Sequence, residues 1–265
     1  MARPPALRRG VSAALDPGRP VRLLEIDPDL AQELDEEDAD RARAELIARA
    51  QRLEWKHHAG HWGPSDPRGY LGLLMLEGVL LREVLLARGG TAELLGAGDL
   101  LRPWDVDGEE FLPVPSEVEW SVLADVRVAV LDSAFALRAA RWPGVMSQLT
   151  SHAVLRAKAI TLDNAISHLK HVETRLLLLF WHFAERWGRV GPQAISVDLP
   201  LTHELLAKFV GATRPSVTTA LGQLSRRGLL VREGGVWRLS RESAEMLEAL
   251  RVLDRPAEPV DTSAW

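Results

Sequence analysis

The stretch from Leu201 to Ser240 reads LTHELLAKFVGATRPSVTTALGQLSRRGLLVREGGVWRLS, and it decides the fold that the sequence predicts. Thr202 and Thr213 are placed to begin two helices, because a threonine there accepts a hydrogen bond from a free backbone N–H. Gly211 between them is placed to end the first helix, since glycine adopts the left-handed conformation that often follows a helix. These signals predict two short helices joined by a tight turn.

The second of these helices has one apolar side, and a hairpin follows it. Apolar residues at spacings i, i+3, i+4 and i+7 lie on one side of a helix. Here they are Val217, Ala220, Leu221 and Leu224. Gly228 is placed to end the helix, and residues 229–239 then alternate around Glu233-Gly234-Gly235, as in a two-stranded hairpin. A helix–turn–helix followed by a β wing is a fold that places its second helix in the major groove of DNA.

The opposite side of the second helix carries small hydroxyl groups, a glycine and a cation. At about 100° per residue, this face centres on Pro215, Thr219, Gly222 and Arg226. Small residues allow a helix backbone to approach base edges, hydroxyl groups bond bases, and an arginine holds a phosphate. The residues that we predict to bind DNA are Thr202, Thr213, Arg214, Pro215, Ser216, Thr218, Thr219, Gly222, Gln223, Arg226 and Arg232. The sequence leaves open the alternative of a winged helix that contacts another protein.

Charge favours the DNA prediction. Between Leu201 and Arg241 the acids are Glu204 and Glu233, whereas the cations are Lys208, Arg214, Arg226, Arg227, Arg232, Arg238 and Arg241. The whole chain has a formal net charge of -5. A basic segment in an acidic chain is expected where one part attracts phosphate and the rest does not. Double-stranded DNA is therefore the predicted partner.

These residues also resemble the DNA-binding domain of the Crp–Fnr transcription regulators, whose pattern is T-x-x-x-[LI]-A-x-x-x-G-x-[ST]-R-x-[ST]-V-x-R-x-L followed by a wing. The matching residues are Leu206-Ala207, Gly211, Thr213-Arg214, Ser216-Val217 and Leu221. Pro215 and Thr219 depart from the pattern, since catabolite-activator-type members carry Glu and Arg there. The resemblance implies the fold and the way it docks on DNA, but not the base preference. It implies no enzymatic activity.

Residues 21–143 are expected to form a double-sheet jelly roll built from short strands and glycine turns, giving an α+β fold overall. Val126, Val128 and Val130 alternate with Asp125 and Arg127, which is typical of a strand with one buried face. Gly78 interrupts an apolar run, so we predict a bulge or turn there. Within residues 27–49, a surface helix is expected from Ala39 to Arg49, with Asp35 or Asp38 near its start. ELLGAGDLLRPW resembles the G-x-[ED]-L-[LI]-G-x-G-D stretch of the family.

Family members that bind a cyclic nucleotide carry a phosphate cassette, F-G-E followed by R-[ST]-A. Gly108-Glu109 resembles its first part, but no arginine lies between Arg102 and Arg127, and Pro113 and Pro115 interrupt any helix there. A buried phosphate without a cation or a helix N-terminus is strongly disfavoured. We therefore predict a regulator that does not respond to a cyclic nucleotide, with its effector unknown and no cofactor. The alternative is a cyclic-nucleotide-responsive regulator with a divergent pocket.

Residues 144–171 are predicted to form a long dimerisation helix, since no Gly or Pro lies between Val145 and Lys170. Apolar residues recur in a heptad pattern that favours a parallel two-helix coiled coil. The predicted dimer-interface residues are Leu155, Ala159, Leu162, Ile166 and Leu169. A homodimer would place two recognition helices on a palindromic operator, with RNA polymerase as a candidate partner. The alternative is a helix that packs on its own domain.

The rest of the sequence predicts the domain boundaries and excludes some classes of site. Residues 1–20 are predicted to be disordered and residues 254–265 to be a loose tail, while 172–253 form the DNA-binding domain. Within that domain, His171–Trp187 is expected to be a helix and Gly188–Pro200 a linker. Absence of any cysteine excludes disulfides and cysteine-ligated clusters. No apolar run reaches a membrane-spanning length, so the predicted location is the cytoplasm.

One cluster invites a different interpretation. His57, His58 and His61 lie close together in the sequence, and His57 and His61 have the i, i+4 spacing of metal ligands on a helix. Gly60 and Gly63 argue against a rigid helix there, and no carboxylate completes a metalloprotease motif. We therefore predict no metal site, with a metal-dependent enzyme as the rival hypothesis.

Overall fold

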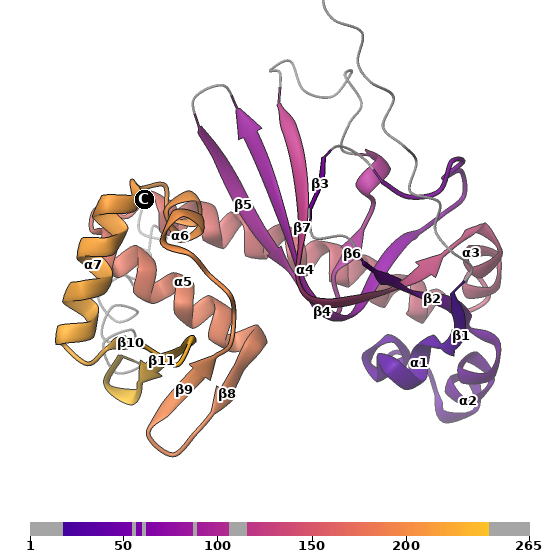
Figure 1. Ribbon diagram of the computed structural model, residues 1–265. Helices are drawn as coiled ribbons and strands as arrows, with labels where there is room; N and C mark the ends of the chain where they lie inside the picture. The colour runs from indigo at the N-terminus through magenta and orange to yellow at the C-terminus, as the bar shows by residue number, and fades with distance from the viewer. Residues whose placement is uncertain (1–17, 55–56, 60–61, 87–88, 106–115, 244–265) are drawn as a thin grey trace, which may run out of the picture. The chain divides into compact units, whose positions relative to one another are not determined.

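The computed structural model describes residues 18–54, 57–59, 62–86, 89–105 and 116–243. The chain divides into two compact units, residues 1–162 and residues 163–265. The long helix α4 (Pro143–Ser167) begins in the first unit and ends in the second (Figure 1). Among the described residues, no helix is both long enough and apolar enough to cross a membrane.

The N-terminal unit combines an antiparallel sheet with short helices. Its strands are β1 (Arg19–Arg22), β2 (Ile47–Leu53), β3 (His58–Ala59), β4 (Gly72–Leu86), β5 (Gly89–Leu95), β6 (Leu100–Leu101) and β7 (Glu117–Leu131). Its helices are α1 (Leu23–Ile26), α2 (Glu36–Glu45), α3 (Ser133–Ala139) and the first part of α4. The strand order is β1-β2-β7-β4-β5, with β3 paired to β7 and β6 to β4. The predicted α+β fold class is confirmed.

Two long strands, β4 and β7, form the centre of this sheet, as Figure 1 shows, so the expectation of short strands is wrong. Each has 15 residues, and their pairing shifts register around Gly78. Gly78 has a φ of 93°, and a Cβ there would lie 2.1 Å from the Asp125 carbonyl oxygen. The bulge predicted at Gly78 is therefore confirmed, and it lets one strand continue through a bend where the sequence suggested a break.

The two faces of the sheet support separate hydrophobic cores, because successive strand residues point to opposite sides. On one face, Leu74 and Ala129 pack with Phe135 of α3 and Leu149 of α4. On the other, the core contains Leu53, Trp62, Leu73, Met75, Leu80, Leu95, Leu101, Val118, Trp120, Val126 and Val128. The predicted alternation in β7 is thus confirmed, with a second buried face that the sequence pattern did not indicate.

Two expectations for the N-terminal region need correction. The helix expected to reach Arg49 ends at Glu45, and β2 begins at Ile47 because it pairs with β1 on one side and β7 on the other. β1 begins at Arg19, inside the segment 1–20 predicted to be disordered; residues 1–17 lie outside the described part of the chain. Asp35 does cap α2, accepting a hydrogen bond from the Asp38 N–H at 2.8 Å.

The described residues of the C-terminal unit form helices and a small sheet. The helices are α5 (Val172–Trp187), α6 (His203–Phe209) and α7 (Arg214–Arg226). The strands are β8 (Gly188–Val190), β9 (Ala194–Val197), β10 (Leu230–Glu233) and β11 (Val236–Ser240), in the order β10-β11-β9-β8. The predicted linker 188–200 is wrong, since β8 and β9 form a hairpin that extends the wing. The predicted tail 254–265 lies outside the described residues.

Candidate nucleic-acid interface

The two helices α6 and α7 begin and end where the sequence predicted. Thr202 accepts a hydrogen bond from the Leu205 N–H at 3.1 Å, and Thr213 caps α7. Gly211 has a φ of 58°, the left-handed conformation that ends α6 and turns the chain. Helix–turn–helix geometry is therefore encoded locally, in caps and in one glycine.

Arg175 of α5 holds this turn in place, and sequence patterns gave no indication of it. Its Nη1 donates to the Val210 carbonyl at 2.9 Å, at the end of α6. Its Nε donates to the Leu169 carbonyl at 2.5 Å, in the segment between α4 and α5. One guanidinium thus links the segment after α4 to the turn before α7.

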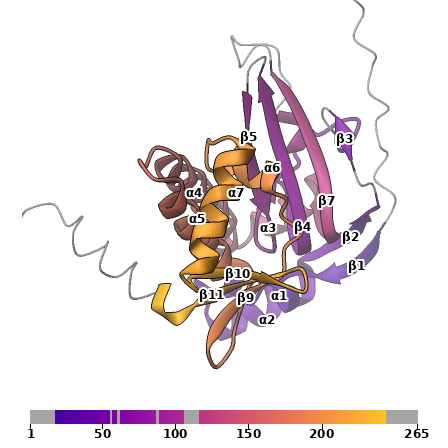
Figure 2. The ribbon, with the colours of Figure 1, turned by 60° about the vertical axis from the view of Figure 1, so that its left-hand side comes forward.

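One side of α7 is buried and the other is open to solvent. Its buried residues are Val217, Ala220, Leu221 and Leu224, as predicted. They face α5, in which Leu176, Leu177, Leu179, Phe180 and Phe183 are also buried. Figure 2 shows α7 along the outside of this unit, with the β10–β11 hairpin beside its end. A helix so placed presents one continuous face to a partner.

Gly222 lies on the open side of α7, and no contact with the described residues requires a glycine there. A Cβ at this position would meet no heavy atom within 4 Å. Glycine inside a helix costs about 0.5–1 kcal/mol relative to alanine. Thr219 and Arg226 beside it are exposed, whereas Gln223 is half-buried. A glycine that packing does not demand is consistent with close approach of another molecule.

Several of the predicted hydroxyl contacts are already engaged within the chain. Thr213 Oγ1 and Ser216 Oγ lie 2.9 Å apart, and both belong to the start of α7. Thr218 Oγ1 donates to the Arg214 carbonyl at 3.0 Å and lies 2.9 Å from His203 Nδ1. The hydroxyl proton of Thr218, one of the residues predicted to bind DNA, is therefore engaged within the chain. His203 is a site residue that the sequence analysis missed.

The wing turns at Gly234 and Gly235, which have φ values of 56° and 89°, as a tight hairpin turn requires. Behind it, the Trp237 ring lies 4.7 Å from the Phe180 ring of α5. Arg232, predicted to bind DNA, stacks its guanidinium over Trp237 with its carbon 5.0 Å from the ring centroid. The stacking fixes the orientation of Arg232 while leaving its residue exposed.

Other cations of this unit differ in how far they are neutralised. Arg238 forms an ion pair with Glu233 at 3.1 Å, which cancels one charge on the wing. Arg214 and Arg226 are exposed at opposite ends of α7. These two therefore provide the positive charge that flanks the open face.

The predicted dimer seam divides into two parts. Leu155 and Leu162 are 60% and 46% exposed on α4 and remain available to a partner. Ile166 is only 4% exposed, buried within its own chain, so its assignment to the interface is corrected. Leu169 lies beyond Ser167, where α4 ends, and is half-buried. The helix ends before the heptad pattern does. Ala159 is half-buried.

An ion-pair cluster joins α4 to the sheet of the N-terminal unit. Arg156 donates to both carboxylate oxygens of Glu93, at 2.7 and 2.9 Å, and to the Leu100 carbonyl at 3.1 Å. Arg82 approaches the same carboxylate at 3.3 Å. Both arginines are thus engaged by a protein carboxylate. The cassette-like residues Gly108-Glu109, Pro113 and Pro115 lie outside the described residues.

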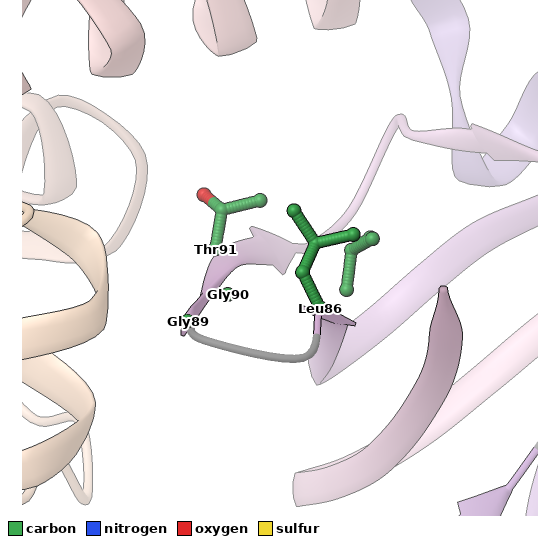
Figure 3. Close-up of a pocket in the computed structure, with 5 residues that line it drawn as sticks. Leu86, Gly89, Gly90 and Thr91 are labelled. Carbon is green, nitrogen blue, oxygen red and sulfur yellow. The ribbon is translucent and has the colours of Figure 1, made fainter. Parts of the chain in front are cut away.

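A shallow apolar pocket lies where β4 ends and β5 begins (Figure 3). Its volume is about 380 Å³, and it is lined by Val84, Leu86, Gly89, Gly90 and Thr91. None of these lining residues carries a charge. These uncharged lining residues give no argument that the pocket binds an anionic effector.

The histidine cluster shows no metal-binding geometry in the part of the chain that the structure describes. His57 lies with Nδ1 3.3 Å from Ser121 Oγ and with Nε2 3.6 Å from Glu119. His58 belongs to β3, paired with Trp120 of β7, and His61 lies outside the described residues. Among the described residues, no three ligand side chains gather as a metal site.

Comparison with known proteins agrees with this geometry. Residues 174–250 match the model of the Crp-like helix-turn-helix domain. Regulatory protein CysR of Synechococcus elongatus is 34% identical over 71 residues, which are 26% of this chain and 34% of that protein. The match thus spans about a third of the length of this curated relative.

Solved structures extend the likeness to the fold of both units. A CRP/FNR-family transcriptional regulator of Thermus thermophilus, TTHA1359, has a TM-score of 0.54 at 20% identity, covering 76% of this chain and 98% of that one. A mutant of CooA from Carboxydothermus hydrogenoformans has a TM-score of 0.57 at 17% identity, covering 91% and 97%. A cyclic nucleotide-binding domain containing protein of Listeria monocytogenes has a TM-score of 0.59 at 14% identity, covering 84% and 99%. The chain therefore has the Crp–Fnr fold, and the resemblance seen in the sequence is confirmed.

Proposed function

We propose that this protein is a DNA-binding transcriptional regulator that acts as a homodimer on a palindromic operator. The observation that carries the proposal is the open face of α7. There Gly222, exposed Thr219 and exposed Arg226 lie opposite a fully packed side, and the exposed Arg214 begins the helix. Small groups that approach base edges, flanked by cations that hold phosphates, are what a recognition helix requires.

The exposed leucines of α4 support the proposal of a dimer. Leu155 and Leu162 lie seven residues apart, and Val154 and Ile160 are also more than 40% exposed, at 48% and 44%. Exposed apolar residues along one helix favour association with a second copy. Two helix–turn–helix units related by a two-fold axis would read two half-sites about 34 Å apart.

The effector is a separate question within this proposal. The Arg156–Glu93 ion pair joins α4 to β5. We infer that the protein binds DNA without a cyclic nucleotide, because the arginines near this strand are already paired with a carboxylate. Contact with RNA polymerase remains a candidate interaction.

The test is equilibrium binding of the full chain to a fluorescent mixed-sequence duplex across a range of salt concentrations. Wild-type protein should bind at low salt and lose affinity steeply as salt rises. In a plot of the logarithm of the binding constant against the logarithm of the salt concentration, Arg226→Ala should make the slope shallower. We expect a change of about 0.9 for each phosphate that the arginine neutralises in the wild-type complex. Arg49→Ala, which removes an exposed cation from β2, is the matched control and should leave the slope unchanged.

Absence of duplex binding at low salt would overturn the proposal and favour the alternative of a winged helix that contacts protein. Binding with an unchanged slope in Arg226→Ala would remove only Arg226 from the interface. The two outcomes are therefore distinguishable.

A further inference from the structure

His203 is the first residue of α6, and its side chain bonds to the recognition helix. Nδ1 of His203 lies 2.9 Å from Thr218 Oγ1. The same hydroxyl donates to the Arg214 carbonyl at 3.0 Å. Among the described residues, Thr218 is the one bonding partner that the structure shows for the His203 side chain. The bond joins the two helices of the helix–turn–helix at the edge of its open face.

This arrangement fixes which ring nitrogen carries the proton in neutral His203. A threonine hydroxyl has one hydrogen, and here it is donated to the Arg214 carbonyl. The hydroxyl oxygen must therefore accept from His203, so Nδ1 carries the hydrogen. In a neutral imidazole the other nitrogen, Nε2, is then an acceptor only. A second proton converts Nε2 into a donor and gives the ring a positive charge.

We propose that His203 is a proton-dependent phosphate contact, so that DNA binding takes up a proton at Nε2 and strengthens as the pH falls. This proposal rests on the proposed function. The first helix of a helix–turn–helix crosses the DNA backbone when the second enters the major groove. His203 stands at the start of that first helix and bonds to Thr218, which flanks the groove-facing side of α7. Neutral Nε2 would repel a phosphate oxygen, whereas protonated Nε2 donates to it.

Three charged residues lie near His203 in the sequence or on the adjoining helix. Glu204 follows His203 on α6, Asp198 precedes it in the loop after β9, and Arg214 begins α7. The phosphates of bound DNA carry negative charge, which favours a second proton on a histidine beside them. The DNA-bound state therefore holds the proton more tightly than the free protein does. By linkage, a complex that takes up a proton gains affinity as the pH falls.

The experiment measures dissociation constants of the full chain and a mixed-sequence duplex at fixed low salt, from pH 8 to pH 6. Wild-type affinity should rise by about five-fold per subunit, the range of an exposed ion pair. The salt slope should be steeper at pH 6 than at pH 8 by about 0.9 for each added phosphate contact.

Four variants separate this contact from other effects. His203→Gln should bind with less change between the two pH values, and His203→Arg should bind tightly at both. Thr218→Val removes the acceptor that fixes the tautomer, so neutral His203 gains freedom to present an Nε2 hydrogen and the pH dependence should shrink. His171→Gln removes an exposed histidine at the start of α5 and is the control, which should behave like wild type.

Wild-type affinity that is equal at both pH values, or weaker at pH 6, would overturn the proposal. So would a His203→Gln variant that keeps the full wild-type pH dependence. Absence of DNA binding at every pH would instead overturn the proposed function itself. Circular dichroism of each variant, with wild-type helix content, shows that the fold is retained.

Discussion

Gly222→Ala should change stability and DNA affinity in opposite directions. Gly222 lies inside α7, its φ is outside the left-handed range, and an added Cβ would meet no heavy atom within 4 Å. Alanine is therefore accommodated without strain. We expect the free energy of unfolding to rise by about 0.5–1 kcal/mol, because glycine loses more backbone entropy on folding.

The same methyl group should weaken DNA binding, because it projects from the face that we assign to the groove. Overpacking of a close contact costs about 1–3 kcal/mol, so we expect the dissociation constant to rise by about five-fold to a hundred-fold. Stability is measured by chemical denaturation, and affinity by fluorescence anisotropy with a duplex at fixed salt.

Ser225→Ala is the matched control. Ser225 is exposed in the last turn of the same helix and lies about 100° around the axis from the centre of the open face. It should leave DNA affinity within two-fold of wild type. A Gly222→Ala protein that is stabilised and binds DNA as tightly as wild type would refute our assignment of the groove-facing side.

Two further predictions concern the dimer and the interior. Leu155→Glu should raise the dimer dissociation constant by about ten-fold or more, since it removes from each subunit an exposed leucine that the proposed dimer would bury. Sedimentation equilibrium measures this, and Leu137→Glu, at an apolar residue 77% exposed on α3, should leave the dimer intact. Burial lowers the pKa of His182 below its ordinary 6.5, so the folded state disfavours its proton. The associated stability is present above the ordinary pKa and is lost as the pH falls through the lowered one. Denaturation at pH 7.5 and pH 5.5 should show this loss in wild type and less of it in His182→Gln.

The helix–turn–helix could be predicted because its signals are local. Thr202, Thr213 and Gly211 each determine the conformation of their own turn, and the paired glycines determine that of the wing. The apolar spacing in α7 likewise gives its buried side directly. These features depend on neighbours a few residues apart.

The missed strands depend on partners that are distant in sequence. β9 pairs with β11, some forty residues later, and its neighbour Gly191-Pro192 reads as a linker. β2 follows a helix without a Gly or Pro to mark the change, and its pairing with β7 determines its conformation. Short strands of this kind take their stability from the sheet rather than from local preference.

Within the site, the apolar spacing of α7 predicted its solvent-exposed face but not the hydrogen bonds that side chains on this face form within the chain. The Thr218 hydroxyl is used by Arg214 and His203, and this could be seen only once α6 and α7 were placed together. Ile166 continues the heptad pattern of α4 yet is buried in its own chain. Periodicity identifies a face of a helix, but not which molecule covers it.

The most direct test of DNA recognition by a dimer is selection of bound sequences from a random duplex pool with the full chain. We predict enrichment of an inverted repeat whose half-sites are centred about one helical turn, or 34 Å, apart. Recovery of no enriched sequence, or of a single asymmetric site bound by one subunit, would contradict the account.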